Sequence, residues 1–148
     1  MDSRQAADHL TASMEDYLEA IYLLEQDLKV VRMKDLMHFL NFKVSSVNSA
    51  IKILAERGFV EHEKYGHVEL TPAGRAVAEK VYSRHENIYR FFHHVLGVEK
   101  DTARNDACRI EHTLSPETYT RFLAFLTYVE RRLTAPEITK GINRYRET

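Results

Sequence analysis

The sequence predicts a mainly α-helical protein, with an N-terminal winged helix-turn-helix followed by a C-terminal helical domain. Three observations support this fold class: two short amphipathic segments joined by a tight connection, two short β-type segments directly after them, and several longer amphipathic segments in the second half. The chain has 148 residues, which suits one or two small domains with a substantial core. We place the domains at residues 1–71 and 72–148, because Thr71-Pro72 is a typical helix start.

The composition is that of a soluble globular protein, with 44% hydrophobic and 29% charged residues and a formal net charge of -1. No apolar run approaches the ~20 residues that span a bilayer, and the N-terminus lacks the hydrophobic core of a secretory signal. The single cysteine cannot form an intramolecular disulfide, which fits a reducing compartment. We therefore expect a cytoplasmic protein with no membrane partner.

The first half of the chain supplies the elements of the helix-turn-helix. Ser13 is predicted to cap a helix that runs from Met14 to about Asp27. Residues 33–40 form a short amphipathic helix, and a second helix runs from Val44 to the glycine that follows Arg57. This is the spacing of a helix-turn-helix. Residues 59–63 and 67–70 are predicted as the two strands of a wing.

The second of these helices has a polar face that suits DNA. Its short hydrogen-bonding side chains and one cation fit base edges and phosphates, whereas an ordinary solvated face favours Glu, Lys, Arg and Gln. Residues 29–75 hold eight Lys or Arg against five Asp or Glu, which is only a modest excess of positive charge. We therefore expect DNA binding to depend on a dimer that doubles the phosphate contacts. The candidate DNA-binding residues are Lys43, Ser45, Ser46, Asn48, Ser49 and Lys52, with Lys64, Tyr65 and His67 at the wing tip.

The second half is predicted to be a helical dimerisation domain. A long helix runs from Pro72 to about His94, another begins at Asp101 or Thr102, and Ser115-Pro116 starts a third. The third helix is apolar on more than one side, which indicates packing on both a core and a partner chain. One more short helix is expected around residues 138–145.

Cys108, Glu111 and His112 are spaced to share one helical face, where a thiol, a carboxylate and an imidazole can bind a metal once deprotonated. A buried cysteine beside a solvated Glu-His pair explains the same residues equally well. Asp16 and Glu19, three residues apart on the first helix, have a simple explanation as acids that complement the helix dipole. A single histidine such as His85 on an apolar face is more often a core residue than a ligand.

Taken together and in this order, these motifs resemble the diphtheria toxin repressor and manganese transport regulator family of metal-dependent transcriptional repressors. The likeness covers about residues 13–130 and depends on five segments: residues 14–19 (MEDYLE), 45–47 (SSV), 70–74 (LTPAG), 84–85 (RH) and 107–115 (ACRIEHTLS). The resemblance implies a homodimer that binds a double-stranded DNA operator, with no organic cofactor and no enzymatic activity. The implied metal ligands are Asp16, Glu19, His85, Cys108, Glu111 and His112.

The resemblance is a hybrid of two branches. The acidic pair on the first helix resembles the manganese branch, whereas Cys108 in a Cys-Arg-x-Glu-His run resembles the iron branch. The second metal site of the iron branch is incomplete, because Tyr89 and Arg104 stand where that branch places ligands. Because the chain stops at Thr148, we expect the short form without the SH3-like domain of longer relatives.

The expected function is repression of metal-uptake genes in response to a divalent cation. Mn²⁺ is the first expectation and Fe²⁺ the second, with Co²⁺ or Zn²⁺ possible in vitro because a thiolate shifts preference towards them. The metal is expected to tie the DNA-binding half to the dimerisation half. One alternative is a winged-helix regulator that senses an organic ligand or thiol oxidation through Cys108. A di-iron enzyme is disfavoured, because the chain has no second Glu-x-x-His motif in register.

Overall fold

A computed structural model describes residues 10–63 and 66–146, and divides the chain between Tyr82 and Ser83 into two compact units. The division falls inside α5 (Pro72–Arg90), and the predicted domain boundary at Thr71 stays a prediction. The helices and the small sheet confirm the mainly α fold with a winged helix-turn-helix. No helix in the described part of the chain is long and apolar enough to cross a membrane.

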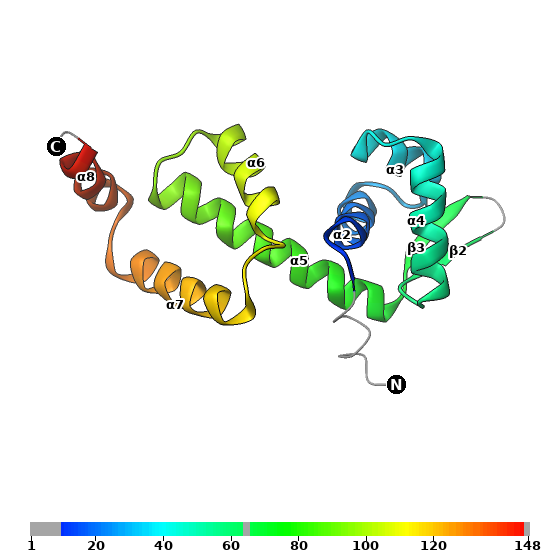
Figure 1. Cartoon of the computed structure of the whole chain (residues 1–148). Coiled ribbons are helices and arrows are strands. Elements are labelled where there is room, and N and C mark those ends of the chain that lie inside the picture. Colours follow the sequence, from blue (N-terminus) through cyan, green and yellow to red (C-terminus); the bar gives the residue numbers. More distant parts are fainter. Residues whose placement is uncertain (1–9, 64–65, 147–148) are drawn as a thin grey trace. The chain divides into compact units, whose positions relative to one another are not determined.

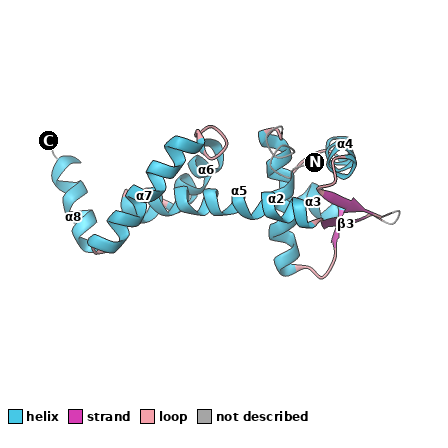
Figure 2. Ribbon diagram, turned by 90° about the horizontal axis from the view of Figure 1, so that it is seen from below, coloured by secondary structure: helices cyan, strands magenta, loops and turns pink. Residues whose placement is uncertain are grey.

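The first unit is the winged helix-turn-helix (Figure 1). Its elements before α5 are α2 (Ala12–Asp27), β1 (Val31–Arg32), α3 (Met33–Leu40), α4 (Val44–Glu56), β2 (Val60–His62) and β3 (His67–Leu70). The strands are antiparallel in the order β1-β3-β2, and Figure 2 shows them in magenta beside α3 and α4. Val68 pairs with Val31 on one side and with His62 on the other, so β3 holds the wing to the body of the unit.

One hydrophobic core orients the two helices of the helix-turn-helix. Val47, Ile51 and Leu54 on α4 are completely buried, in the same core as Leu18 of α2 and Leu36 of α3. Three buried positions at spacings of four and three residues leave the opposite face of α4 in solvent. The polar residues of α4 that are predicted to bind DNA therefore point away from the core.

Two backbone positions fix the connections of this unit. Asn41 ends α3 in the left-handed conformation, with φ of 54°, and directs the chain into the turn before α4. Gly74 lies in the first turn of α5, where an added Cβ would be 1.9 Å from the carbonyl oxygen of Phe59. Thr71 caps this turn: its Oγ1 accepts the Gly74 amide at 3.1 Å and donates to the Gly58 carbonyl at 2.7 Å. The start of α5 is therefore packed directly on the chain that leaves α4.

The second unit consists of the end of α5 and a set of shorter helical elements. These are η1 (Phe91–Val95, a π-helix), α6 (Lys100–Ile110), α7 (Pro116–Arg132) and α8 (Ala135–Arg146). A small core forms from Val95, Leu126 and Val129. The ring of Phe91 meets that of Phe122 edge-on at a centroid distance of 5.1 Å.

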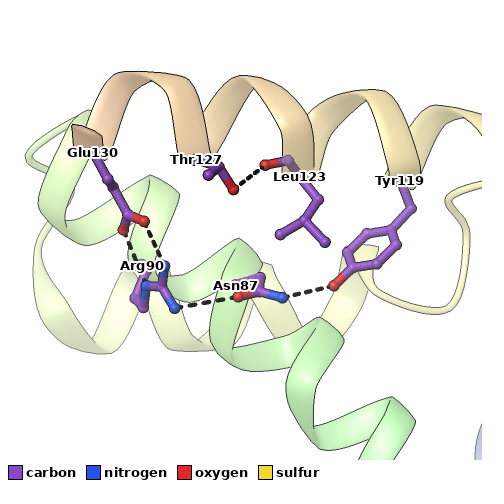
Figure 3. Close-up of polar contacts among 6 residues, drawn as sticks. All are labelled: Asn87, Arg90, Tyr119, Leu123, Thr127 and Glu130. Carbon is purple, nitrogen blue, oxygen red and sulfur yellow. Dashed lines mark hydrogen bonds and ion pairs between the residues drawn. The ribbon is translucent and has the colours of Figure 1, made fainter. Parts of the chain in front are cut away.

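A polar seam fixes α7 on α5 within this unit, and Figure 3 shows its members. Asn87 Nδ2 donates to Tyr119 Oη at 2.8 Å, and Arg90 Nη1 donates to Asn87 Oδ1 at 3.3 Å. Arg90 also donates twice to the Glu130 carboxylate, at 3.1 and 2.6 Å. The seam therefore joins four residues, two from each helix, in a continuous chain of hydrogen bonds with a charged pair at its end.

Several predicted boundaries differ from the structure by a few residues. The first helix begins at Ala12 with Thr11 as its N-cap, because Thr11 Oγ1 accepts the Met14 amide at 3.3 Å. α6 begins at Lys100, where the Glu99 carboxylate accepts two backbone amides. The long helix changes to a π-helix after Arg90 instead of continuing to His94. The predicted helix start at Ser115-Pro116 is confirmed: Ser115 is the N-cap, and its Oγ accepts the Thr118 amide at 3.1 Å.

Candidate functional site

The Cys-x-x-Glu-His run lies at the end of α6, and the helix stops inside it. The last helical residue is Ile110, and Glu111 is the C-cap, still in the right-handed helical conformation with its amide on the Ala107 carbonyl. Thr113 closes the turn by donating from both its amide and its Oγ1 to the Ile110 carbonyl. The predicted single helical face therefore holds as far as Glu111, while His112 lies in the turn that follows.

In the described part of the chain, Glu111 is the only charged or polar residue that is fully buried, and it lies between two imidazoles. Its Oε2 is 3.0 Å from His85 Nδ1, and its Oε1 is 3.2 Å from His112 Nε2. The histidine side chains are themselves only 14% and 11% exposed. Oε1 is close enough to His112 for an ion pair but forms no hydrogen bond within residues 10–63 and 66–146. Within the second unit, the structure therefore brings together His85, Glu111 and His112, three of the six predicted metal ligands.

The surroundings keep this buried carboxyl ionised. Burial by itself raises the pKa of Glu111, but the neighbouring His112 and His85 rings lower it by more, so that the pKa lies below its usual range. An ionised carboxylate with an oxygen on each of two imidazoles has the charge and the donor atoms that a divalent cation needs. A ring that carries its proton on the nitrogen facing Glu111 presents a lone pair on its other nitrogen.

Arg84 positions the backbone of this carboxylate. Its Nη1 donates to the carbonyl oxygen of Glu111 at 3.1 Å, and its guanidinium lies over the ring of Tyr119 at 4.9 Å from the centroid. This contact connects the metal-binding candidates to the α5–α7 seam through Tyr119. The sequence placed Arg84 beside His85 in a motif but did not predict that it would hold Glu111.

The other three predicted metal ligands are Asp16 and Glu19 in the first unit and Cys108 in the second. Asp16 and Glu19 are partly buried on α2 in the first unit, on either side of the buried pair Tyr17 and Leu18. Cys108 is exposed on α6, one turn before Glu111. These three residues stay predicted ligands.

The N-terminus of α4 forms an electropositive point on the first unit. Lys43 is the N-cap residue, its side chain makes no capping hydrogen bond, and no acidic residue lies in the first turn. A helix N-terminus carries partial positive charge, which acids normally offset. Here a cation is added to it instead, which favours an anion such as a phosphate. Beyond it, the polar face is exposed as predicted, at Ser45, Ser46, Asn48, Ser49 and Lys52.

Of the three predicted DNA-binding residues of the wing, the structure describes one, and it remains a predicted contact. His67 is the first residue of β3, and its Nδ1 lies 3.8 Å from Glu63 Oε2, an acid that weakens its attraction for a phosphate. The predicted wing-tip residues Lys64 and Tyr65 lie outside the described residues.

The fold and the site define a class, a winged-helix DNA-binding protein with a candidate metal centre, and comparison with known proteins gives the family. Residues 9–68 match the model for the N-terminal DNA binding domain of iron dependent repressors. Residues 71–140 match the model for their metal binding and dimerisation domain. An uncharacterized HTH-type transcriptional regulator of Methanocaldococcus jannaschii is 36% identical over 118 residues, which cover 79% of this chain and 94% of that protein.

Solved structures give the same result. A manganese-dependent transcriptional repressor in complex with manganese is 30% identical, with a TM-score of 0.71, over 78% of this chain and 53% of its own. The manganese regulator SloR is also 30% identical, with a TM-score of 0.67, over 78% of this chain and 54% of its own. This chain thus spans about half the length of these solved regulators. The protein belongs to the iron-dependent repressor family of metal-dependent transcriptional regulators, a family of DNA-binding proteins and not of enzymes.

Proposed function

We propose that this protein is a metal-dependent transcriptional repressor that is activated by Mn²⁺ or Fe²⁺, binds a double-stranded DNA operator as a homodimer, and controls metal-uptake genes. The observation that carries the proposal is the buried, ionised Glu111 between His85 and His112. A fully buried carboxylate with an oxygen that lacks a hydrogen bond fits a divalent cation in both charge and donor type.

The proposed ligand set combines these three residues with Asp16, Glu19 and Cys108, for which the order of the sequence motifs and the family are the support. A bound divalent cation would offset the charge of the clustered carboxylates and link the ligands that share it. Arg84 holds the Glu111 backbone, so the carboxylate is positioned before binding. The low pKa of Glu111 means that no proton has to leave this group when a cation arrives.

The coupling to DNA follows from where the ligands lie in the chain. Asp16 and Glu19 belong to the first unit, and His85, Glu111 and His112 belong to the second. Ligands from both units on one ion would restrict the movement of one unit against the other. In a dimer this would favour a recognition-helix spacing near one DNA turn, about 34 Å. Metal and operator would then each strengthen the binding of the other by the same factor, typically worth about 1–3 kcal/mol.

Manganese is the first choice of metal. Carboxylate and imidazole ligands suit both Mn²⁺ and Fe²⁺, and a solved relative with 30% identity is a manganese-dependent repressor in complex with manganese. The thiol of Cys108 would shift preference towards Fe²⁺, Co²⁺ or Zn²⁺. Intrinsic affinity is lowest for Mn²⁺ in the divalent series, so selectivity for it would depend on coordination number and on supply in the cell.

DNA binding to the protein's own promoter region tests the proposal. Affinity is measured in anaerobic buffer at fixed salt, first with chelator and then with Mn²⁺, Fe²⁺ or Zn²⁺, because phosphate contacts make affinity steeply salt-dependent. We expect Mn²⁺ or Fe²⁺ to tighten binding at least about tenfold, equal to about 1.4 kcal/mol. Glu111→Gln, which keeps the shape and removes the charge, is expected to abolish the gain.

The matched control is Glu117→Gln. Glu117 is 75% exposed on α7 and pairs with Arg121 one turn along the same helix, so this variant is expected to keep the full metal response. An affinity that is the same with chelator and with every metal would refute the proposal, and so would a Glu111→Gln variant with the wild-type gain.

The exposure of Cys108 favours one second candidate, a regulator that senses thiol oxidation. An oxidant would then change DNA affinity in the presence of chelator, and Cys108→Ser would remove that change. Glu111→Gln would leave it intact, which separates this candidate from the metal-dependent one.

A further inference from the structure

The recognition helix α4 begins with exposed apolar side chains that the predicted DNA-binding residues do not include. Val44, the first residue of α4, is 53% exposed, and Phe42 in the turn before it is 43% exposed. A single exposed apolar side chain is ordinary on a protein surface. Their location at the start of α4 makes these two significant, because the N-terminal residues of a recognition helix are the ones that contact base edges in the major groove.

The two apolar side chains are placed differently. The ring of Phe42 packs on the ring of Tyr17 on α2, tilted by 58° at a centroid distance of 5.8 Å, so Phe42 is used in packing the turn against the unit. Val44 belongs to no hydrophobic core cluster of the described residues. It is therefore the apolar group that α4 can offer to a ligand at its N-terminal end.

Asn48, the neighbour of Val44 on the surface of α4, indicates which base pairs Val44 would contact. Asn48 follows one turn later and is exposed, so the two side chains share a row along α4. An asparagine amide suits adenine, which offers N7 and the N6 amino group in the major groove. The C5 methyl of thymine is the one apolar group on major-groove base edges. An aliphatic side chain beside an amide therefore matches a site rich in A·T pairs.

We propose that Val44 is a specificity-determining residue whose side chain contacts the C5 methyl group of a thymine in each operator half-site. The inference rests on the proposed function, since it needs α4 in the major groove of an operator. Four residues advance α4 by about 6 Å, and successive base pairs are about 3.4 Å apart. The thymine therefore lies one or two base pairs from the adenine that Asn48 contacts.

Removal of single methyl groups from the DNA tests this contact. The probe is the duplex that the full-length protein selects, with Mn²⁺ or Fe²⁺ present, from a pool of random sequences. Each thymine in turn is replaced by deoxyuridine, which deletes only the C5 methyl. At one thymine per half-site we expect the wild type to bind about fourfold more weakly, and about 15-fold more weakly when both half-sites are changed. Val44→Ala is expected to bind the two DNAs equally at that position.

Two further variants make the test specific. Ile53→Ala is the matched control: Ile53 is 39% exposed on the same helix, but lies about 14 Å further along it. This variant is expected to keep the full dependence on the methyl group. Val44→Thr keeps the side-chain shape and exchanges one methyl for a hydroxyl, which is expected to reduce the dependence to about twofold. It replaces Val44→Ala in the test if circular dichroism shows that the alanine variant is unfolded.

The possible failures are distinguishable. A wild type that ignores every thymine methyl overturns the inference, and so does a variant at position 44 with the wild-type dependence, while metal-dependent DNA binding stands. If no duplex is selected with either metal, the proposed function and the inference fail together.

Discussion

Gly74→Ala tests the closest approach in the first unit, where α5 begins against the chain that leaves α4. An added Cβ would lie 1.9 Å from the carbonyl oxygen of Phe59 and 2.9 Å from its carbon, whereas real Cβ contacts are essentially never shorter than 3.0 Å. The same carbonyl oxygen accepts the Thr71 amide at 3.1 Å. Alanine therefore forces the start of α5 and the backbone at Phe59 to separate by about 1 Å more than in the wild type, in a close-packed region.

The magnitude follows from three contributions. Over-packing of this kind costs about 1–3 kcal/mol, and weakening the Thr71 hydrogen bond costs about 1 kcal/mol. Alanine is the better helix former and returns about 1 kcal/mol. We expect Gly74→Ala to lower the free energy of unfolding of the first unit by about 2 kcal/mol.

Gly141→Ala is the matched control, because nothing lies within 4 Å of a Cβ at that position in α8. There the substitution is expected to stabilise the helix, by up to about 1 kcal/mol. Urea unfolding followed by circular dichroism gives the total change, and hydrogen exchange assigns it to peptides of the first or the second unit, since two units need not unfold together. A Gly74→Ala variant as stable as the wild type would refute the close approach.

Two further predictions concern the second unit. The pKa of Glu111 is lower in the folded protein than its usual value. The charge of Glu111 therefore stabilises the folded metal-free protein when the pH is above the usual pKa, and this stabilisation is lost as the pH falls through the lowered pKa. Thermal melts between about pH 7 and about pH 3 should therefore show a steeper acid loss for the wild type than for Glu111→Gln, and parallel curves would contradict this. Tyr119→Phe keeps the ring beneath Arg84 but removes the acceptor of Asn87, and is expected to cost about 1 kcal/mol in urea unfolding. Tyr128→Phe, at a ring 59% exposed, should cost almost nothing, and equal costs for the two variants would be evidence against the seam.

The helix-turn-helix was readable from the sequence because its elements obey simple periodicity. Val47, Ile51 and Leu54 are spaced as one face of a helix, and all three are completely buried. The wing was readable for a similar reason: alternating side chains and a turn signal mark its strands, although β2 is shorter than predicted, at Val60–His62. Local patterns of this kind carry their own evidence and need no knowledge of distant contacts.

Features that depend on tertiary contacts were not readable. β1 has two residues, too few for any alternation, and exists because Val31 pairs with Val68. The π-helix at Phe91–Val95 replaces the last turn of a predicted α-helix, in a stretch whose apolar pattern is the same for both geometries. The end of α6 at Ile110 depends on Thr113, which satisfies the Ile110 carbonyl from beyond the helix. For β1 and for the end of α6, the deciding partner lies outside the segment.

The candidate site divides in the same way. The spacing of Cys108, Glu111 and His112 made a metal site one of two equally good interpretations, and His85 gained weight only beside the other motifs. The role of Arg84 was not accessible, because it requires α5 to lie against the end of α6. The electropositive start of α4 was also missed as a feature, although Lys43 was named, because the absence of a side-chain cap is visible only in the structure.

The position of α2 suggests how the predicted metal ligands on it, Asp16 and Glu19, would govern DNA binding without any rearrangement of the helix-turn-helix. Asp16 and Glu19 are partly buried on α2. Their neighbours Tyr17, Leu18 and Ala20 are buried in the core of the first unit. Ile51 of α4 belongs to the same core. Close-packed cores move as units and do not deform continuously. In the proposed function, a ligand bond made at α2 therefore orients α4 together with the whole unit, and the metal controls where the recognition helix lies and not how it is folded.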